Sequence, residues 1–206
     1  MILVCLDFEG VFTPEIWIGV AEKTGIEVLR KTTRDEPDYD KLMKWRLGIL
    51  KENGIGLKEI QEVIGSMGVL EGAKDFIQWL RERSVPIILS DSFYEFAMPL
   101  VAQLGYPPLL CNNIEVNGNG ELIGYSLRQQ DGKKKAVQKF HEMGFKIIGV
   151  GDSYNDITFL KEADRGVFFR PPKNIIKEKH GIPITDTYEE LKAEIEKGIK
   201  ELESSD

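Results

Sequence analysis

Short apolar runs alternate with amphipathic helical patterns over most of this chain. Apolar runs at positions 2–6, 85–89, 146–150 and 166–169 have the length and composition of buried strands. Apolar stripes at helical spacing occupy 73–80, 93–104, 134–143 and 188–203. Because strands and helices come in turn, we predict an α/β fold with a Rossmann-like, doubly wound parallel sheet.

The segment 14–70 interrupts this rhythm with helical patterns alone. Pro14 can open a first helix that Gly25 ends, and Asp38 or Asp40 can cap a second that ends at 53–54. A third helical pattern covers 57–66. We therefore expect a core domain made of 1–13 and 71–206, with 14–70 inserted as an α-helical cap beside the carboxyl edge of the sheet.

A second interruption lies at 109–127. Two apolar-rich runs flank a strong turn signal, which reads Asn117-Gly118-Asn119-Gly120. Such a turn between short strands predicts a β-hairpin.

Composition narrows the classes of function. The 206 residues are 42% hydrophobic and 30% charged, which suits one soluble domain with a real core. The net charge of -7 argues against a nucleic-acid partner. The chain shows no long apolar span and no basic leader, so we expect no membrane role. Cys5 and Cys111 lack the spacing of metal ligands, and we expect a cytoplasmic protein. The sequence leaves a homo-oligomer open.

Chemically distinct polar groups follow several of the predicted strands. They are Asp7 with Glu9, Ser90, Lys133, and Asp152 with Asp156. The carboxyl ends of parallel strands meet at one edge of a sheet, so these groups should gather there. If the first strand stays extended, Asp7 and Glu9 share one of its faces.

This set of groups suits phosphoryl transfer. A carboxylate that attacks phosphorus needs a hard cation beside it, and acids such as Asp7 and Asp152 suit Mg²⁺. The Ser90 hydroxyl can donate to a phosphoryl oxygen, and Lys133 can neutralise charge on the transferred group. Glu9 is placed to give a proton to the leaving alkoxide and to activate water afterwards.

Each of these assignments has a structural alternative. Asp7 and Glu9 can simply cap a following helix, and Ser90 can be an ordinary hydroxyl at a strand end. Lys133 opens a run with Lys134 and Lys135, and such runs usually form a solvated helix face.

The motifs nevertheless resemble those of the haloacid dehalogenase superfamily. The matching segments are Asp7-Phe8-Glu9-Gly10, Ser90, Lys133 and Gly151-Asp152-Ser153-Tyr154-Asn155-Asp156, in the family's order. The helical insertion directly after the first motif resembles the cap of the phosphoserine phosphatase branch. Two further segments, Pro14-Glu15-Ile16-Trp17 and Ser90-Asp91-Ser92-Phe93-Tyr94-Glu95-Phe96, are more particular. They are similar to a bifunctional subgroup, phosphoserine phosphatases that are also homoserine phosphotransferases, in which a glutamate likewise stands at the position of Glu9.

The resemblance implies a role for each matching position. Asp7 would form a phosphoaspartate, and Glu9 would serve as acid and base while its main-chain carbonyl binds Mg²⁺ with Asp7 and Asp152. Asp156 would orient the metal's surroundings and Lys133. Substrate contacts would come from Ser90, Asp91, Lys133 and Asn155.

In the cap, the resemblance assigns substrate recognition to Glu15 and Arg46. The two charges suit a zwitterion, because an arginine pairs with a carboxylate and a glutamate with an ammonium group.

We therefore expect an Mg²⁺-dependent enzyme that hydrolyses O-phosphoserine and transfers the phosphoryl group to homoserine as a second acceptor. One alternative is a related phosphatase for another small phosphorylated metabolite. The other is a non-catalytic, receiver-like phosphate-binding module, although receivers carry their phosphorylated aspartate on a middle strand.

Overall fold

The computed structural model describes residues 1–32, 35–36 and 38–204, and within them the centre of the fold is a seven-stranded sheet. The strands are β1 (Ile2–Leu6), β2 (Val85–Phe93), β3 (Leu109–Val116), β4 (Leu122–Ser126), β5 (Lys146–Gly151), β6 (Arg165–Phe169) and β7 (Ile184–Thr185). Their order is β4-β3-β2-β1-β5-β6-β7, and only β4 runs antiparallel to its neighbour. The doubly wound parallel sheet predicted from the sequence is confirmed, with β1 between β2 and β5.

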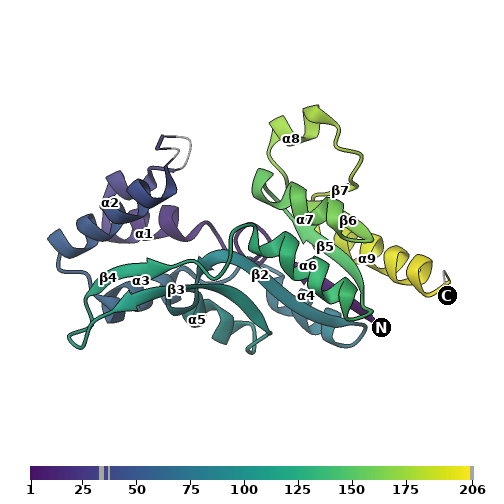
Figure 1. Ribbon diagram of the computed structural model, residues 1–206, viewed down its shortest axis with the longest axis horizontal. Coiled ribbons are helices and arrows are strands. Elements are labelled where there is room, and N and C mark those ends of the chain that lie inside the picture. The colour runs from purple at the N-terminus through teal and green to yellow at the C-terminus, as the bar shows by residue number, and fades with distance from the viewer. Residues whose placement is uncertain (33–34, 37, 205–206) are drawn as a thin grey trace.

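Helices cover both faces of the sheet (Figure 1). On one face lie α4 (Ala73–Arg81), α5 (Tyr94–Gln103) and α9 (Tyr188–Glu203); on the other lie α6 (Gly132–Glu142), α7 (Ile157–Glu162) and α8 (Lys173–Glu178). Side chains of β1 alternate between the two cores: Val4 and Leu6 belong to the first, Leu3 and Cys5 to the second. A strand buried on both sides explains the unbroken apolar run at the start of the chain.

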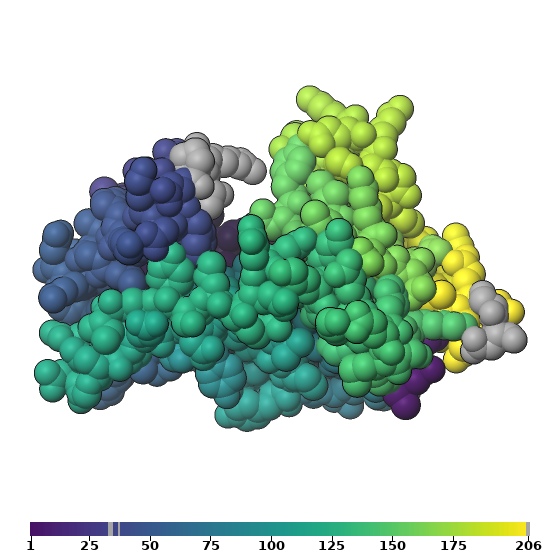
Figure 2. Space-filling view, in the orientation of Figure 1, coloured from purple at the N-terminus to yellow at the C-terminus, as the bar shows by residue number. Residues whose placement is uncertain are grey.

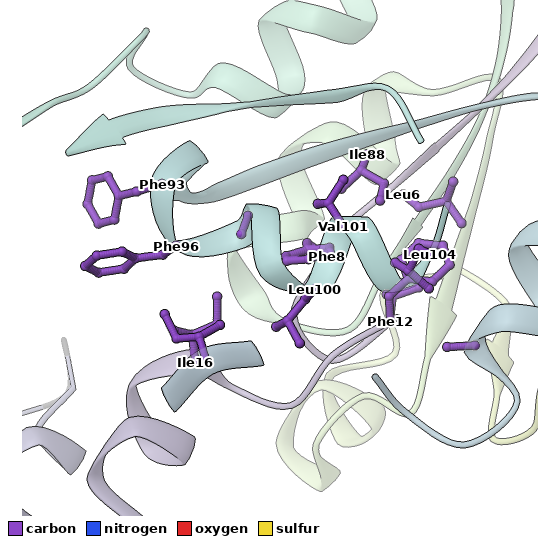
Figure 3. Packing of buried hydrophobic residues seen from close by; sticks show 14 of the residues in the cluster. Leu6, Phe8, Phe12, Ile16, Ile88, Phe93, Phe96, Leu100, Val101 and Leu104 are labelled. Carbon is purple, nitrogen blue, oxygen red and sulfur yellow. The ribbon is translucent and has the colours of Figure 1, made fainter. Parts of the chain in front are cut away.

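The described part of 14–70 is helical, as the sequence predicts. It contains α1 (Ile16–Thr24), the 3-10 turn η1 (Glu27–Arg30), α2 (Tyr39–Glu52) and α3 (Leu57–Met67). Gly25 ends α1 with a φ of 72°, and the Asp38 carboxylate caps α2 by accepting from the Lys41 amide at 3.1 Å. These helices share one apolar cluster with the sheet, and Figure 3 shows Ile16 of α1 pointing toward α5, which carries Phe96 and Leu100.

The predicted hairpin is β3 and β4, and it touches the cap helices. In its turn, the Asn117 side-chain oxygen accepts from the amides of Asn119 and Glu121. The Leu57 amide donates to the Gly120 carbonyl at 2.9 Å, and the Tyr125 hydroxyl donates to Asp40 at 2.9 Å. The hairpin therefore links the core to both α2 and α3.

Element boundaries differ from expectation at three places that matter for the site. β2 continues through Ser90 to Phe93, α5 starts only after it, and α6 begins at Gly132. The pattern analysis did not include α7, α8 or β7. No helix among the described residues is long and apolar enough to cross a lipid bilayer.

Candidate active site

The carboxyl ends of the central strands open into a cleft beneath the cap. It has a volume of about 550 Å³, and Figure 2 shows a hollow between the blue cap helices and the green segment of α7 and α8. The core side of the cleft is lined by Asp7, Glu9, Ser90, Asp91, Ser92, Phe93, Lys133, Asp152, Ser153, Tyr154, Asn155 and Pro172. The cap side is lined by Glu15, Trp17, Ile18, Arg30, Thr32, Tyr39, Leu42 and Arg46. Every candidate site residue except the fully buried Asp156 therefore lines one cavity.

Lys133 is a buried cation on the core side of this cleft. Its Nζ lies 2.7 Å from Asp156 Oδ1, 2.8 Å from Asp7 Oδ1 and 3.4 Å from Asp91 Oδ2, and the residue is 5% exposed. Burial alone would lower the pKa of Lys133, but the carboxylates of Asp156, Asp7 and Asp91 outweigh it and raise the pKa well above its usual value. Lys133 therefore stays charged, and the solvated-helix alternative is wrong for it.

Asp156 fixes the positions of Lys133 and of the loop after β5. It is fully buried; one oxygen accepts from Lys133, and the other accepts from the amides of Asp152 and Ser153 and from the Ser153 hydroxyl. Burial raises the pKa of Asp156, but Lys133 and these donors outweigh it, so the net shift is downward. Gly151 is required here because an added Cβ would lie 2.5 Å from the Asp156 Cβ.

Asp7, Asp152 and Asp156 form an acidic cluster in which one oxygen of each carboxylate lies within 4.8 Å of the others. The loop after β1 makes this approach possible: Gly10 has a φ of 77°, and a Cβ there would lie 2.3 Å from the Asp152 Cγ. Burial and then the repulsion from Asp156 raise the pKa of Asp152 to about 7, and the same causes raise the pKa of Asp7 well above its ordinary value. Clustered carboxylates with such pKa values suit a hard divalent cation with oxygen ligands. Both oxygens of Asp156 already accept hydrogen bonds, so Asp7 and Asp152 are the members left to bind the cation.

Glu9 accepts a backbone hydrogen bond and also lines the cleft. The chain does not stay extended after Leu6, and Glu9 Oε2 accepts from the Ile16 amide at 2.7 Å, at the start of α1. The helix-capping alternative is thus correct for this carboxyl, which still lines the cleft. Burial and then the neighbouring Glu15 carboxylate raise the pKa of Glu9 to about 8. A carboxyl with such a pKa is suited to proton transfer near neutral pH.

Ser90 and Asn155 complete the core side. Ser90 is buried near the end of β2, where its hydroxyl oxygen accepts from the Ser92 amide at 3.1 Å. The pairing of β2 with β3 shifts register between Leu89 and Phe93, which frees this stretch from a regular ladder. Asn155 is exposed in the turn after β5 and lines the cleft.

Glu15 and Arg46 face the same cleft from the cap. Arg46 is 6% exposed: its guanidinium lies 4.5 Å from the centre of the Trp17 ring, and Nη2 donates to the Lys31 carbonyl at 2.7 Å. Burial lowers the pKa of Arg46 to about 10, which leaves it charged at neutral pH. Its Nε has no hydrogen-bond partner among the described residues.

Comparison with known proteins identifies the family. Residues 5–164 match the family model described as a hydrolase, haloacid dehalogenase-like hydrolase. This chain belongs to that family.

Curated relatives cover nearly the whole of this hydrolase. It is 53% identical over 194 residues to "Phosphoserine phosphatase ThrH" of Pseudomonas aeruginosa, covering 94% of this chain and 95% of the relative. It is also 53% identical to "Phosphoserine phosphatase" of Pseudomonas syringae pv. tomato, covering 93% of this chain and 81% of the relative. Among solved structures, a phosphoserine phosphatase in apo form superposes with a TM-score of 0.72 at 22% identity, over 89% of this chain and 93% of that one. The structural likeness shows the shared fold.

Several residues that line the cleft of this hydrolase were not predicted from the sequence. They include Tyr39, Leu42, Arg30, Thr32, Phe93 and Pro172. A signal existed for two of them, because Tyr39, Leu42 and Arg46 stand at i, i+3 and i+7 of one helix and so share a face.

Proposed function

We propose that this haloacid dehalogenase-like hydrolase is an Mg²⁺-dependent phosphoserine phosphatase that works through a phosphoaspartate on Asp7. The observation that carries the proposal is the position of Lys133, buried between Asp7 and Asp156 at the floor of a cleft whose cap side presents Glu15 and Arg46. The two Pseudomonas relatives named as phosphoserine phosphatases support the choice of substrate.

Asp7 is the proposed nucleophile. Its Oδ1 accepts from the Phe8 amide at 2.7 Å and from Lys133, so the carboxylate is oriented before substrate arrives. Its oxygen attacks phosphorus, the bond from phosphorus to the serine oxygen breaks, and the phosphoryl group is carried by Asp7. Lys133 and the Ser90 hydroxyl balance the negative charge that builds on the phosphoryl oxygens.

Glu9 is the proposed acid and base. With a pKa of about 8, it holds a proton that it gives to the departing serine alkoxide. The resulting carboxylate then takes a proton from the water that attacks phosphorus. The bond from phosphorus to Asp7 breaks, inorganic phosphate is released and the Asp7 carboxylate is restored.

Mg²⁺ would be held by the carboxylates of Asp7 and Asp152 together with the main-chain carbonyl of Glu9. When bound, it lowers the repulsion between the carboxylates and the substrate's phosphate and polarises the phosphoryl group. Asp156 keeps Asp152 and Lys133 in place, since it accepts from the Asp152 amide and the Lys133 ammonium group.

We assign substrate recognition to the cap, residues 14–70, set on a core of 1–13 and 71–206. Arg46 pairs with the substrate carboxylate and Glu15 with its ammonium group. Asn155 and Asp91 add polar contacts on the opposite wall of the cleft. The two buried free cysteines, Cys5 and Cys111, suit a reducing compartment such as the cytoplasm.

The same site can pass the phosphoryl group to an alcohol. Homoserine carries the ammonium and carboxylate groups of serine and a hydroxyl one methylene further away. Once serine has left, homoserine can bind the same charged pair. Its hydroxyl oxygen attacks phosphorus while Glu9 takes the hydroxyl proton, and the bond from phosphorus to the Asp7 oxygen breaks, which frees Asp7.

One incubation tests both activities. The protein with O-phosphoserine and Mg²⁺ is expected to release serine and phosphate, and adding homoserine is expected to yield phosphohomoserine. Asp7→Asn should release neither product. If phosphate is released but no phosphohomoserine forms, the proposed transferase activity is wrong. If the protein hydrolyses other phosphorylated metabolites but not phosphoserine, the proposed substrate is wrong.

A further inference from the structure

Tyr39 is a cleft residue to which the proposed mechanism gives no role. It is the first residue of α2, on the same helix face as Leu42 and Arg46, and all three line the cleft. The rise from Tyr39 to Arg46 is about 10 Å along the helix, which two long side chains can span when both reach toward one ligand.

The ring of Tyr39 is held by the hairpin rather than by its own hydroxyl. Tyr125 of β4 meets it edge-on, with ring centres 5.8 Å apart and planes at 89°, and Tyr125 contacts Phe93 in turn at 5.9 Å. Tyr125 is fixed by its hydrogen bond to Asp40. A phenylalanine at position 39 would make the same ring contact, so packing does not require the hydroxyl.

That hydroxyl has no hydrogen bond with any residue that the structure describes. Burial raises the pKa of Tyr39 well above its ordinary value, against the opposing effect of Arg46, so the phenol stays neutral and can donate. The hydroxyl is not among the fully buried atoms without a partner, so it opens onto the cleft, where a ligand can accept its hydrogen bond in place of water.

The charges around the cleft determine which group of a ligand can lie beside the Tyr39 hydroxyl. Glu9 and Asp91 line the core side of the cleft and Glu15 lines its cap side, and each repels an anion. On the cap side, Arg46 attracts one, but its Nη2 is already bonded to Lys31 and its Nη1 lies 3.9 Å from the Met43 sulfur. Tyr39 is on the same helix face and can give a further hydrogen bond to a carboxylate that approaches Arg46.

We propose that the Tyr39 hydroxyl donates a hydrogen bond to the α-carboxylate of the amino-acid substrate, beside Arg46, and thereby selects amino-acid phosphates over other phosphate esters. The inference rests on the proposed function and names a specificity residue for it. Because serine and homoserine carry the same carboxylate, Tyr39 acts on the phosphoryl acceptor as well as on the donor.

The test compares two substrates that differ only in the carboxylate, O-phosphoserine and phosphoethanolamine. Tyr39→Phe is expected to raise KM for phosphoserine about ten-fold, with a much smaller change in kcat, because a hydrogen bond to a charged group is lost. The preference for phosphoserine over phosphoethanolamine in kcat/KM should fall by the same factor. KM for homoserine in the transfer assay should rise similarly.

Tyr106→Phe is the matched control. It also removes a phenol hydroxyl, on an exposed residue that does not line the cleft, and the preference between the two substrates should not change. Thermal melting of both variants reports whether the fold is kept.

Two outcomes overturn the proposal, and they are distinct. If Tyr39→Phe loses activity equally on both substrates, or on neither, Tyr39 does not read the carboxylate, although phosphoserine turnover by the unaltered protein still supports the proposed function. If the unaltered protein does not hydrolyse phosphoserine, the proposed function fails and this inference fails with it.

Discussion

The ammonium group of Lys133 lies 2.7 Å from the carboxylate of Asp156, and both side chains are buried. Asp156 comes from the turn after β5, whereas Lys133 comes from the first turn of α6. The ion pair thus joins two elements that are separate in sequence, and it orients the cation toward Asp7.

Replacing Lys133 by methionine tests this arrangement. Turnover is expected to fall at least about a hundred-fold, since the phosphoryl group loses its fixed cation. The free energy of unfolding should fall by about 3 kcal/mol, because Asp7 and Asp156 are left buried without their counter-ion. Steady-state kinetics and urea unfolding measure the two effects.

Lys134→Met is the control for this variant. Lys134 is the next residue, but its side chain is 36% exposed and pairs only loosely with Glu162 at 3.7 Å. Near-normal turnover and stability are expected. A comparable loss in both variants would mean that a general basic face, and not the buried lysine, supports activity.

Asp152 gives a prediction about pH. Burial raises the pKa of Asp152 to about 7 and that of Glu9 to about 8, whereas both groups titrate near about pH 4 in an unfolded chain. A raised pKa in the folded state favours folding only while the group keeps its proton, so this stability is lost as the pH rises through those values. Without Mg²⁺, Tm should therefore fall by about 5 °C from about pH 5 to about pH 9.

The measurement is thermal melting across this pH range, with EDTA and with Mg²⁺. Bound Mg²⁺ should flatten the decline, because it stabilises the ionised carboxylates. Asp152→Asn should also flatten it in EDTA, and should weaken the response to Mg²⁺. A slope unchanged by both the metal and the substitution would contradict the assignment of Asp152 as a ligand.

Glu9→Gln separates the two functions of this side chain. The amide oxygen of glutamine can still accept from the Ile16 amide, so α1 should keep its start and Tm should change little. Turnover should fall about a hundred-fold to ten-thousand-fold, because neither proton transfer is assisted. Release of serine and release of phosphate should both slow, and single-turnover assays with ³²P-labelled phosphoserine measure the two steps separately. A large loss of Tm would instead place the main role of Glu9 in the fold.

The position of the site could be predicted from the sequence because it depends on topology. Apolar runs followed by Asp7, Ser90 and Asp152 are enough to locate the site, since the carboxyl ends of parallel strands lie at one edge of the sheet. The helical insertion was visible for a similar reason, as caps such as Asp38 and stops such as Gly25 are local signals.

Other features depend on contacts between distant segments. Tyr125 and Asp40, which are hydrogen-bonded, lie 85 positions apart in the sequence. No local sequence pattern predicts that Tyr125 of the hairpin will contact the ring of Tyr39. β7 has only two residues, and α7 and α8 have six each; tertiary contacts such as those of Phe159 and Ile175 stabilise them. The capping role of Glu9 also depends on a turn that the strand pattern does not show.

Gly10 provides a test of how closely the first loop must approach Asp152. Alanine there is strained twice, because φ is 77° and because its Cβ would lie 2.3 Å from the Asp152 Cγ. Asp152 must move away from Asp7, so the Mg²⁺ concentration for half-maximal activity should rise at least about ten-fold. Gly118→Ala is the matched control: it lies in the hairpin turn, nothing is within 4 Å of its added Cβ, and the Mg²⁺ response should stay normal. An unchanged Mg²⁺ response in Gly10→Ala would show that Asp152 is not held against this loop when the metal binds.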